Sequence, residues 1–328
     1  MSGTALITGI TGQDGSYLAE LLLSKGYEVH GIVRRTSTPG TGRLETLMRA
    51  SSDSGRKLVL HFGDMSEPLG IATLVKQIQP GEIYHLAAQT DVGASFEIPE
   101  ITTETNALGT LRVLEAMRIG APAARLFNAG SSEMFGRTAG PQNELSPFSP
   151  CSPYGYSKAY AFWATVNYRN SYGLFISNGM SFNHESERRG INFVTQKIAV
   201  SVAAIAAGAE DRLVLGDLAA VRDWGYAPEY VQAMWLALQQ DEPDDYVLAT
   251  GRGHTVADFC RMAFAEAGLD WRDHVSTSLD HLRPEEPSAL VGDPKKADEI
   301  LGWRARTTLP EIVTLMVKAA RDIRRPRS

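Results

Sequence analysis

Short apolar runs alternate with longer amphipathic stretches through the first half of the chain. Each run lacks the polar alternation of a half-exposed strand, which is typical of strands buried on both faces. Between the runs, apolar residues recur at helical spacing, and glycine or proline marks the ends. We predict strands at 5–8, 27–33, 58–62, 82–89 and 124–129, with helices at about 17–26, 66–77 and 103–119. This alternation favours an α/β fold with a doubly wound parallel sheet, whose carboxyl-terminal strand ends form a ligand crevice.

The second half of the chain mixes shorter elements. We predict strands at 174–180, 213–215 and 246–249, helices at about 193–207, 229–240 and 294–301, a polar turn at 183–190, and a C-terminal amphipathic helix. We expect residues 1–182 to form the sheet domain, completed by about 223–258. Residues 183–222 and 259–328 would form a smaller, discontinuous lobe. The basic stretch 321–327 is interpreted as a solvated chain end.

Composition narrows the class of protein. Of 328 residues, 43% are hydrophobic and 21% charged, as in ordinary globular proteins. The net charge of −6 argues against a general nucleic-acid binder, although local arginines can still bind a phosphorylated ligand. Cys151 and Cys260 form neither a disulfide framework nor a zinc site, and His184 beside Glu185 makes a poor metal site. With neither a secretory leader nor a bilayer-spanning run in the sequence, we expect a cytoplasmic protein without metal or membrane contacts.

A glycine-rich turn joins the first strand to the first helix. Gly9, Gly12 and Gly15 follow the strand directly, in the wider spacing seen in extended short-chain dehydrogenases. Such glycines let the backbone approach a pyrophosphate at a helix N-terminus, so the turn predicts a dinucleotide site in a Rossmann-like sheet. An ordinary strand–helix turn is the alternative. The expected cofactor contacts here are Gly9, Thr11, Gly12, Gln13, Asp14 and Gly15.

The end of the second strand selects the cofactor. NAD sites usually place Asp or Glu there to bind the ribose hydroxyls, but this strand ends in Arg34 and Arg35. Two arginines cannot accept hydrogen bonds from hydroxyls but can bind a 2′-phosphate, which predicts NADP. A solvated basic turn is the alternative. Asp64, after the third strand, could accept from the adenine amine or cap the next helix instead.

Candidate catalytic residues flank the loop after the fifth strand. Tyr154 and Lys158 are four apart, so a helix places them on one face. A nearby ammonium stabilises a phenolate, so we predict that Lys158 lowers the pKa of Tyr154 and makes it a base. Tyr156 would point away from Lys158. Ser131 and Glu133 alternate as on a strand end and can face one cleft, and no cation adjacent in sequence suggests a structural salt bridge to Glu133.

Cationic residues are scattered through loops and helix starts of the second half. Such residues can converge on a nucleoside diphosphate, whereas unrelated surface charges are the alternative. The four candidates are Arg189, Lys197, Arg222 and Arg283.

Several segments resemble the nucleotide-sugar short-chain dehydrogenases, most closely the GDP-mannose 4,6-dehydratase family. They are 5–18, 183–186, 188–190, 193–195, 222–225 and 283–286. The resemblance implies catalytic roles for Ser131, Glu133, Tyr154 and Lys158, with Ser131 standing where the family has threonine. It implies cofactor contacts by Gly9, Gly12, Gln13, Asp14, Arg35, Asp64, Met65, Leu86, His184 and Arg189, and we add Ala88, Gln89, Tyr154 and Lys158. The implied GDP contacts are Asn183, Lys197, Arg222, Arg283 and Glu286, and we add Ser95 as a substrate contact.

The resemblance also implies a reaction. GDP-mannose would become GDP-4-keto-6-deoxymannose and water, with hydride passing from C4 to NADP and then to C6. Glu133 would distinguish this dehydratase from its alternatives, a GDP-sugar 4-ketoreductase or epimerase of the same fold. A related substrate such as GDP-manno-heptose and an NADP-sensing protein without activity are further alternatives. The family also implies a homo-oligomer, dimer or tetramer, in which loop 34–43 reaches a neighbour's cofactor site.

Overall fold

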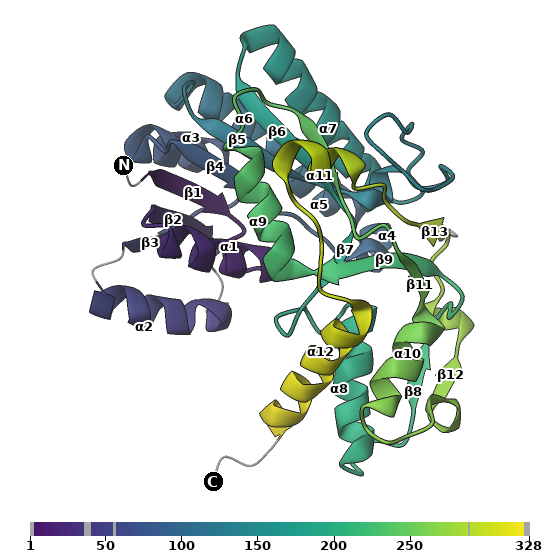
Figure 1. Ribbon diagram of the computed structural model, residues 1–328. Coiled ribbons are helices and arrows are strands. Elements are labelled where there is room, and N and C mark those ends of the chain that lie inside the picture. The colour runs from purple at the N-terminus through teal and green to yellow at the C-terminus, as the bar shows by residue number, and fades with distance from the viewer. Residues whose placement is uncertain (1–2, 36–40, 55–56, 288, 325–328) are drawn as a thin grey trace.

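A seven-stranded parallel sheet forms the centre of the molecule (Figure 1). The computed structural model describes residues 3–35, 41–54, 57–287 and 289–324. Every neighbouring pair in the sheet is parallel, in the order β10-β6-β5-β4-β1-β2-β3, which confirms the predicted fold class. The strands are β1 (Thr4–Thr8), β2 (Glu28–Val33), β3 (Leu58–Phe62), β4 (Glu82–His85), β5 (Arg125–Ser131), β6 (Phe175–Ser181) and β10 (Asp245–Leu248).

Helices cover both faces of this sheet (Figure 1). On one face, α1 (Gln13–Ser24), α9 (Ala227–Ala237) and α11 (Lys295–Leu301) bury their apolar sides in one core. On the other face, α3 (Pro68–Ile78), α6 (Gly109–Gly120) and part of α7 (Pro153–Tyr172) bury a second core. Because both faces are covered, the central strands need apolar residues throughout, which explains their continuous apolar runs. The short helix η1 (Gly42–Leu44) and α2 (Glu45–Ser54) follow β2.

Two predicted elements have different bounds in the structure. The fourth strand ends at His85 rather than residue 89. The Leu86 amide still donates to the Thr8 carbonyl at 3.2 Å, but the Ala87 amide donates to the Thr8 side chain, as the Leu86 amide also does. The helix predicted at 103–119 is divided into a π-helical turn (Glu104–Leu108) and α6. Two short helices, α4 (Val92–Glu97) and α5 (Pro99–Thr103), precede it.

A smaller lobe is built around a second sheet. Strand β9 (Val221–Tyr226) pairs with β7 (Asn183–Glu185), β11 (Gly253–Thr255) and β13 (Ala289–Leu290). The helices α8 (Val194–Ala206), α10 (Val256–Ala265) and α12 (Leu309–Arg324) share a third apolar core. The remaining elements are β8 (Leu213–Leu215), β12 (Val275–Thr277), η3 (Ser132–Met134), η4 (Trp271–Asp273) and η5 (Leu279–His281).

The segment expected to complete the main sheet, 223–258, is divided between the two sheets. Only β10 belongs to the seven-stranded sheet, whereas β9 and β11 pair with each other in the small lobe. The sequence could not reveal this, because short strands with similar residue types can join either sheet. The turn predicted at 183–190 likewise begins with the short strand β7, which joins the small lobe's sheet.

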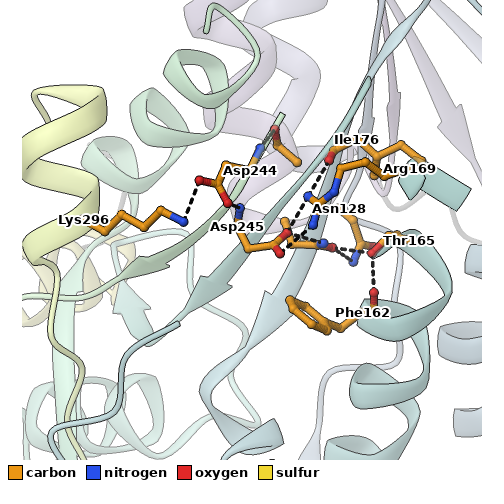
Figure 2. A network of polar contacts seen from close by, with 10 residues as sticks. Asn128, Phe162, Thr165, Arg169, Ile176, Asp244, Asp245 and Lys296 are labelled. Atoms are coloured by element: carbon orange, nitrogen blue, oxygen red, sulfur yellow. Dashed lines mark hydrogen bonds and ion pairs between the residues drawn. The ribbon is translucent and has the colours of Figure 1, made fainter. Parts of the chain in front are cut away.

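A buried polar network fixes α7 to the sheet (Figure 2). Asn178 on β6 accepts from Asn128 on β5 and from Thr165 on α7, at 2.9 and 2.8 Å. Asp245 on β10 accepts a hydrogen bond from Asn178. It also forms a bidentate ion pair with Nη1 and Nη2 of Arg169 on α7. Since a partly satisfied buried network would be costly, these contacts favour one position of α7, the helix that carries Tyr154 and Lys158.

Candidate functional site

A single large cavity of about 2130 Å³ runs along the carboxyl-terminal strand ends and continues into the small lobe. Pockets for one small molecule usually measure about 300–1,000 Å³, so this cavity has room for two ligands placed end to end. All but one of the residues predicted for the site line it. Ser95 does not, because its side chain is fully buried and its hydroxyl donates to the carbonyl of Val92 within α4. Ser181, Asn192 and Asp217 also line the cavity, and their isolated positions in the sequence gave no signal.

The glycine turn is closely packed at one end of the cavity. Gly9 has a φ of +74°, and a Cβ there would lie 2.8 Å from the amide nitrogen of Ala87. A Cβ on Gly15 would lie 2.3 Å from the carbonyl oxygen of Gly9. No larger residue fits at either position without a backbone shift. The turn therefore brings the N-terminus of α1, with its unpaired amides, directly to the cavity wall.

An ion pair joins this turn to the small lobe. Nε2 of His184 lies 2.7 Å from Oδ2 of Asp14, and Nδ1 lies 2.7 Å from the carbonyl oxygen of Phe182. Burial lowers the pKa of His184, but the Asp14 carboxylate outweighs it, so the net pKa is raised. Burial raises the pKa of Asp14, but His184 outweighs it and the net pKa is lowered. These two contacts fix β7 against the start of α1.

The end of β2 places two cations beside the same cavity. Arg34 and Arg35 are exposed and line its wall, and no carboxylate stands at these two positions. Asp64 does not cap a helix, because α3 begins four residues later and Oδ1 of Asp64 accepts from the amide and hydroxyl of Ser66. These two bonds, with the charge of Arg34, lower the pKa of Asp64 despite partial burial. Residues 36–40 of the loop expected to reach a neighbouring subunit lie outside the described residues.

The tyrosine and lysine of α7 lie at the centre of the cavity wall, where α7 begins at a Ser152 cap. The prediction that Lys158 lowers the pKa of Tyr154 is wrong for this structure. Burial raises the pKa of Tyr154 to about 12, the Ser131 hydroxyl opposes the shift, and the charge of Glu133 adds to it. Nζ of Lys158 donates to the carbonyl of Ala129 at 2.7 Å, and burial lowers its pKa to about 8. Tyr154 is therefore a neutral phenol here, and Tyr156 is exposed, outside the cavity.

Glu133 lies beside Ser131, as predicted, but the local backbone differs from the expectation. Ser131 ends β5, whereas Glu133 is in the short helix η3, and its amide donates to Oγ of Ser131 at 3.2 Å. Glu133 has a cationic neighbour that its local sequence does not show. Nη1 of Arg283 lies 3.6 Å from its Oε1 atom. Its other oxygen, Oε2, is buried and has no hydrogen-bond partner within the described ranges.

The cationic residues of the small lobe line the other end of the cavity. Arg222 is buried, pairs with Glu286 and donates to the carbonyl of Pro287 at 3.1 Å. Arg283 donates to Glu286 at 3.1 Å. Burial raises the pKa of Glu286, and the two arginines only partly oppose it. Asn183, Arg189 and Lys197 also line the cavity, and the charge of Arg189 acts on Asp14 of the glycine turn. The convergence of the four candidate cations on one nucleoside diphosphate stays a prediction.

Comparison with known proteins identifies the family. Residues 6–316 match the family model described as GDP-mannose 4,6 dehydratase. GDP-mannose 4,6 dehydratase 1 of Arabidopsis thaliana is 50% identical over 95% of this chain and 88% of its own length. The human GDP-mannose 4,6 dehydratase is 45% identical over 98% of this chain and 92% of its own.

Solved structures share the whole architecture. Thermus thermophilus UDP-glucose 4-epimerase, solved with NAD, is 27% identical with a TM-score of 0.82, covering 97% of this chain and 99% of its own. The dTDP-glucose 4,6-dehydratase of Bacillus anthracis is 19% identical with a TM-score of 0.83, covering 98% of this chain and 97% of its own. At this low identity the likeness shows the fold alone. With a family model matching most of its length and relatives near 50% identity, the chain belongs to the GDP-mannose 4,6-dehydratase family.

Proposed function

We propose that the protein converts GDP-mannose to GDP-4-keto-6-deoxymannose and water with bound NADP. One observation carries this proposal: the cavity holds a second acid–base residue, Glu133, beside the Ser131 and Tyr154 pair. A ketoreductase needs only one proton-transfer group at C4, whereas a dehydratase needs another at C5 and C6. The dehydratase function of the relatives, at up to 50% identity, supports the same choice over a reductase or epimerase.

The turn end of the cavity fits a dinucleotide. Gly9 and Gly15 let the turn pack closely on the protein's own backbone, which brings the N-terminus of α1 to the cavity where a pyrophosphate could bind. Arg34 and Arg35, with no acid at the end of β2, suit a 2′-phosphate better than free ribose hydroxyls. Gln89 Oε1 and Ser181 Oγ are buried cavity-lining atoms that lack a partner in the described part of the chain, as expected where a ligand completes the site. When bound, NADP accepts a hydride from C4 and returns it to C6, so no outside reductant is consumed.

The first proton transfer belongs to Tyr154. In its phenolate form, Tyr154 takes the proton from the sugar O4 as the C4–H bond breaks, and Ser131 holds O4 in place. Because burial, only partly opposed by the Ser131 hydroxyl, raises the pKa of Tyr154 to about 12, the phenol needs nearby positive charge to lose its proton when substrate is present. Lys158 is the cation on the same face of α7, and with a pKa of about 8 it remains charged at neutral pH.

The second proton transfer belongs to Glu133. A ketone at C4 acidifies the C5–H bond, and a carboxylate oxygen without a partner is suited to accept that proton. The C6–O bond then breaks, and the same proton leaves with the hydroxyl as water. The partnerless Oε2 atom of Glu133 is the oxygen that we assign to this transfer.

The small-lobe end of the cavity fits a nucleoside diphosphate. Arg222, Arg283 and Lys197 reach it from three different elements, and guanidinium groups bind phosphate oxygens in pairs. Asn183 adds an amide for the sugar or base. A GDP-sugar is therefore the proposed substrate.

Incubation of the protein with GDP-mannose, without added NADPH, tests the proposal. Mass spectrometry should show a product lighter by one water, because the hydride taken from C4 returns to C6. Parallel reactions with GDP-manno-heptose compare the two sugars directly. A product lighter by two hydrogens, or a C4 epimer of unchanged mass, would contradict a dehydratase.

We further propose a homo-oligomer, a dimer or a tetramer. Tyr156, Tyr160 and Trp163 are exposed at helical spacing on one face of α7. Ile101 of α5, which packs beside α7, is also exposed. Exposed apolar patches of this kind mark association surfaces in many soluble proteins. Light scattering tests the assembly, and a stable cofactor-bound monomer would contradict it.

The cellular location is also a proposal. Cys151 and Cys260 are buried free thiols, which suits the reducing cytoplasm. Within the described residues, no helix is long and apolar enough to cross a membrane. In the same residues, no group of three or more His, Cys, Asp or Glu could hold a metal ion.

A further inference from the structure

The loop after η5 meets the catalytic segment through paired charges. Nη1 of Arg283 lies between two carboxylates, 3.1 Å from Oε1 of Glu286 and 3.6 Å from Oε1 of Glu133. The same Glu286 oxygen pairs with Arg222 on β9. A chain of alternating charges thus links η3 of the large domain to β9 in the small lobe's sheet. It runs through Glu133, Arg283, Glu286 and Arg222.

The two oxygens of Glu133 are in different environments. Oε1 faces Arg283, whereas Oε2 is buried and has no partner in the ranges that the structure describes. The backbone of Glu133 is fixed separately, because its amide donates to Ser131 and its carbonyl packs on Gly155, where a Cβ would lie 2.6 Å away. The remaining freedom is rotation of the side chain, and Arg283 is the charged group that opposes this rotation.

We propose that Arg283 is a positioning residue for the elimination half of the reaction. By holding Oε1 of Glu133, it presents Oε2 to the C5 proton of the bound sugar. This inference rests on the proposed dehydratase function and adds a role to the nucleotide contact expected for Arg283. The shortest contact in each of its two ion pairs uses Nη1, so its other guanidinium nitrogens can still meet a phosphate.

A neighbouring ion pair in the same loop supplies a matched control. Nη2 of Arg137 lies 2.5 Å from Oε1 of Glu285, and both side chains are well exposed. Arg137→Met and Arg283→Met each remove one ion pair between this loop and the segment that follows β5. Only Arg283→Met removes the pair with Glu133. A general loosening of the loop would affect both variants, whereas loss of positioning would affect only the Arg283 variant.

The experiment measures the two half reactions separately, in single turnovers with saturating GDP-mannose in D₂O. NADPH absorbance follows oxidation at C4, and mass spectrometry follows deuterium incorporation at C5. Arg283→Met should slow the C5 step about 10- to 100-fold more than the C4 step, as expected for a misplaced catalytic group. Arg137→Met should leave the ratio of the two rates at the wild-type value.

Two results would overturn the positioning role: an unchanged ratio in Arg283→Met, or an equal fall of the ratio in both variants. If Arg283→Met does not fold, Arg283→Lys keeps the charge but loses the guanidinium geometry, and its ratio should also fall. An unchanged ratio in that variant would contradict the inference. Failure of the proposed function is distinguishable, because wild-type protein would then show no hydride transfer from C4 of GDP-mannose.

Discussion

The two ends of the cavity are built in different ways. The turn end comes from seven consecutive residues, 9–15, which follow β1 and include the start of α1, and its shape is set by backbone packing. The opposite end combines side chains from four separate elements, η3, α8, β9 and the loop after η5, and ion pairs set its shape. Local motifs therefore determine where the first ligand would lie, whereas tertiary packing determines how the second would be held.

The largest expected effect comes from breaking the turn end. In Gly15→Ala, the new Cβ would lie 2.3 Å from the carbonyl oxygen of Gly9, so the backbone must shift. Overpacking of this kind costs about 3 kcal/mol, and we expect NADP affinity to fall about 100-fold. Calorimetric titration measures the affinity. Gly42→Ala, where a Cβ meets nothing within 4 Å, is the control and should bind normally.

A smaller effect should separate the two nicotinamide cofactors. Arg35→Ala removes a charged contact to the 2′-phosphate, worth about 2 kcal/mol, so NADP binding should weaken about 30-fold. NAD lacks this phosphate, so its binding should change little. Fluorescence titration with both cofactors makes the comparison, and equal losses for NADP and NAD would contradict the NADP proposal.

The catalytic end should respond to the hydroxyl of residue 131 rather than to its shape. Ser131→Ala removes the group that we assign to O4, so turnover should fall about 10- to 100-fold, the equivalent of one to three kcal/mol. Ser131→Thr restores the family's usual residue and should stay within a few-fold of wild type. Steady-state rates with GDP-mannose provide the test. An alanine variant as active as wild type would show that Ser131 has no such role.

The smallest effect concerns pH and the ion pair that joins the two ends. Asp14 raises the pKa of His184 in the folded state. The ion pair therefore contributes all of its stabilisation of the folded protein at pH values below the unfolded pKa of His184, about 6.5. This stabilisation is lost as pH rises through the higher folded pKa. Asp14, with a lowered pKa, loses its contribution only in acid, below its usual pKa of 3.8. The stability difference between wild type and His184→Gln should therefore shrink from pH 6 to pH 9 in urea unfolding. A constant difference would argue against the charged pair.

The contrast between the two ends also explains what the sequence could predict. The strand–turn–helix order located β1, α1 and the glycine contacts, because each depends on neighbours in the chain. The pairing of Glu133 with Arg283 depends on residues 150 positions apart, so no local pattern could indicate it. The pKa of Tyr154 was wrongly predicted for a similar reason. Helical spacing puts Lys158 on the right face, but burial and a carbonyl partner for Lys158 are tertiary features.

Ser95 and the segment 223–258 show the same limit. Ser95 was predicted as a substrate contact, but its hydroxyl is used within its own helix. Strands β9 and β10 are both short, with six and four residues, and only the packed structure assigns them to two different sheets.

The central claim is that Glu133 separates elimination from oxidation, and deuterium incorporation at C5 by Glu133→Gln tests it most directly. Glutamine keeps the size and polarity of the side chain but cannot take the C5 proton. In D₂O, the variant should still transfer hydride from C4 of GDP-mannose to NADP, so NADPH absorbance should accumulate. Incorporation of deuterium and release of water should fall about 10²–10⁴-fold. Incorporation at the wild-type rate would show that another residue is the base and would contradict the account.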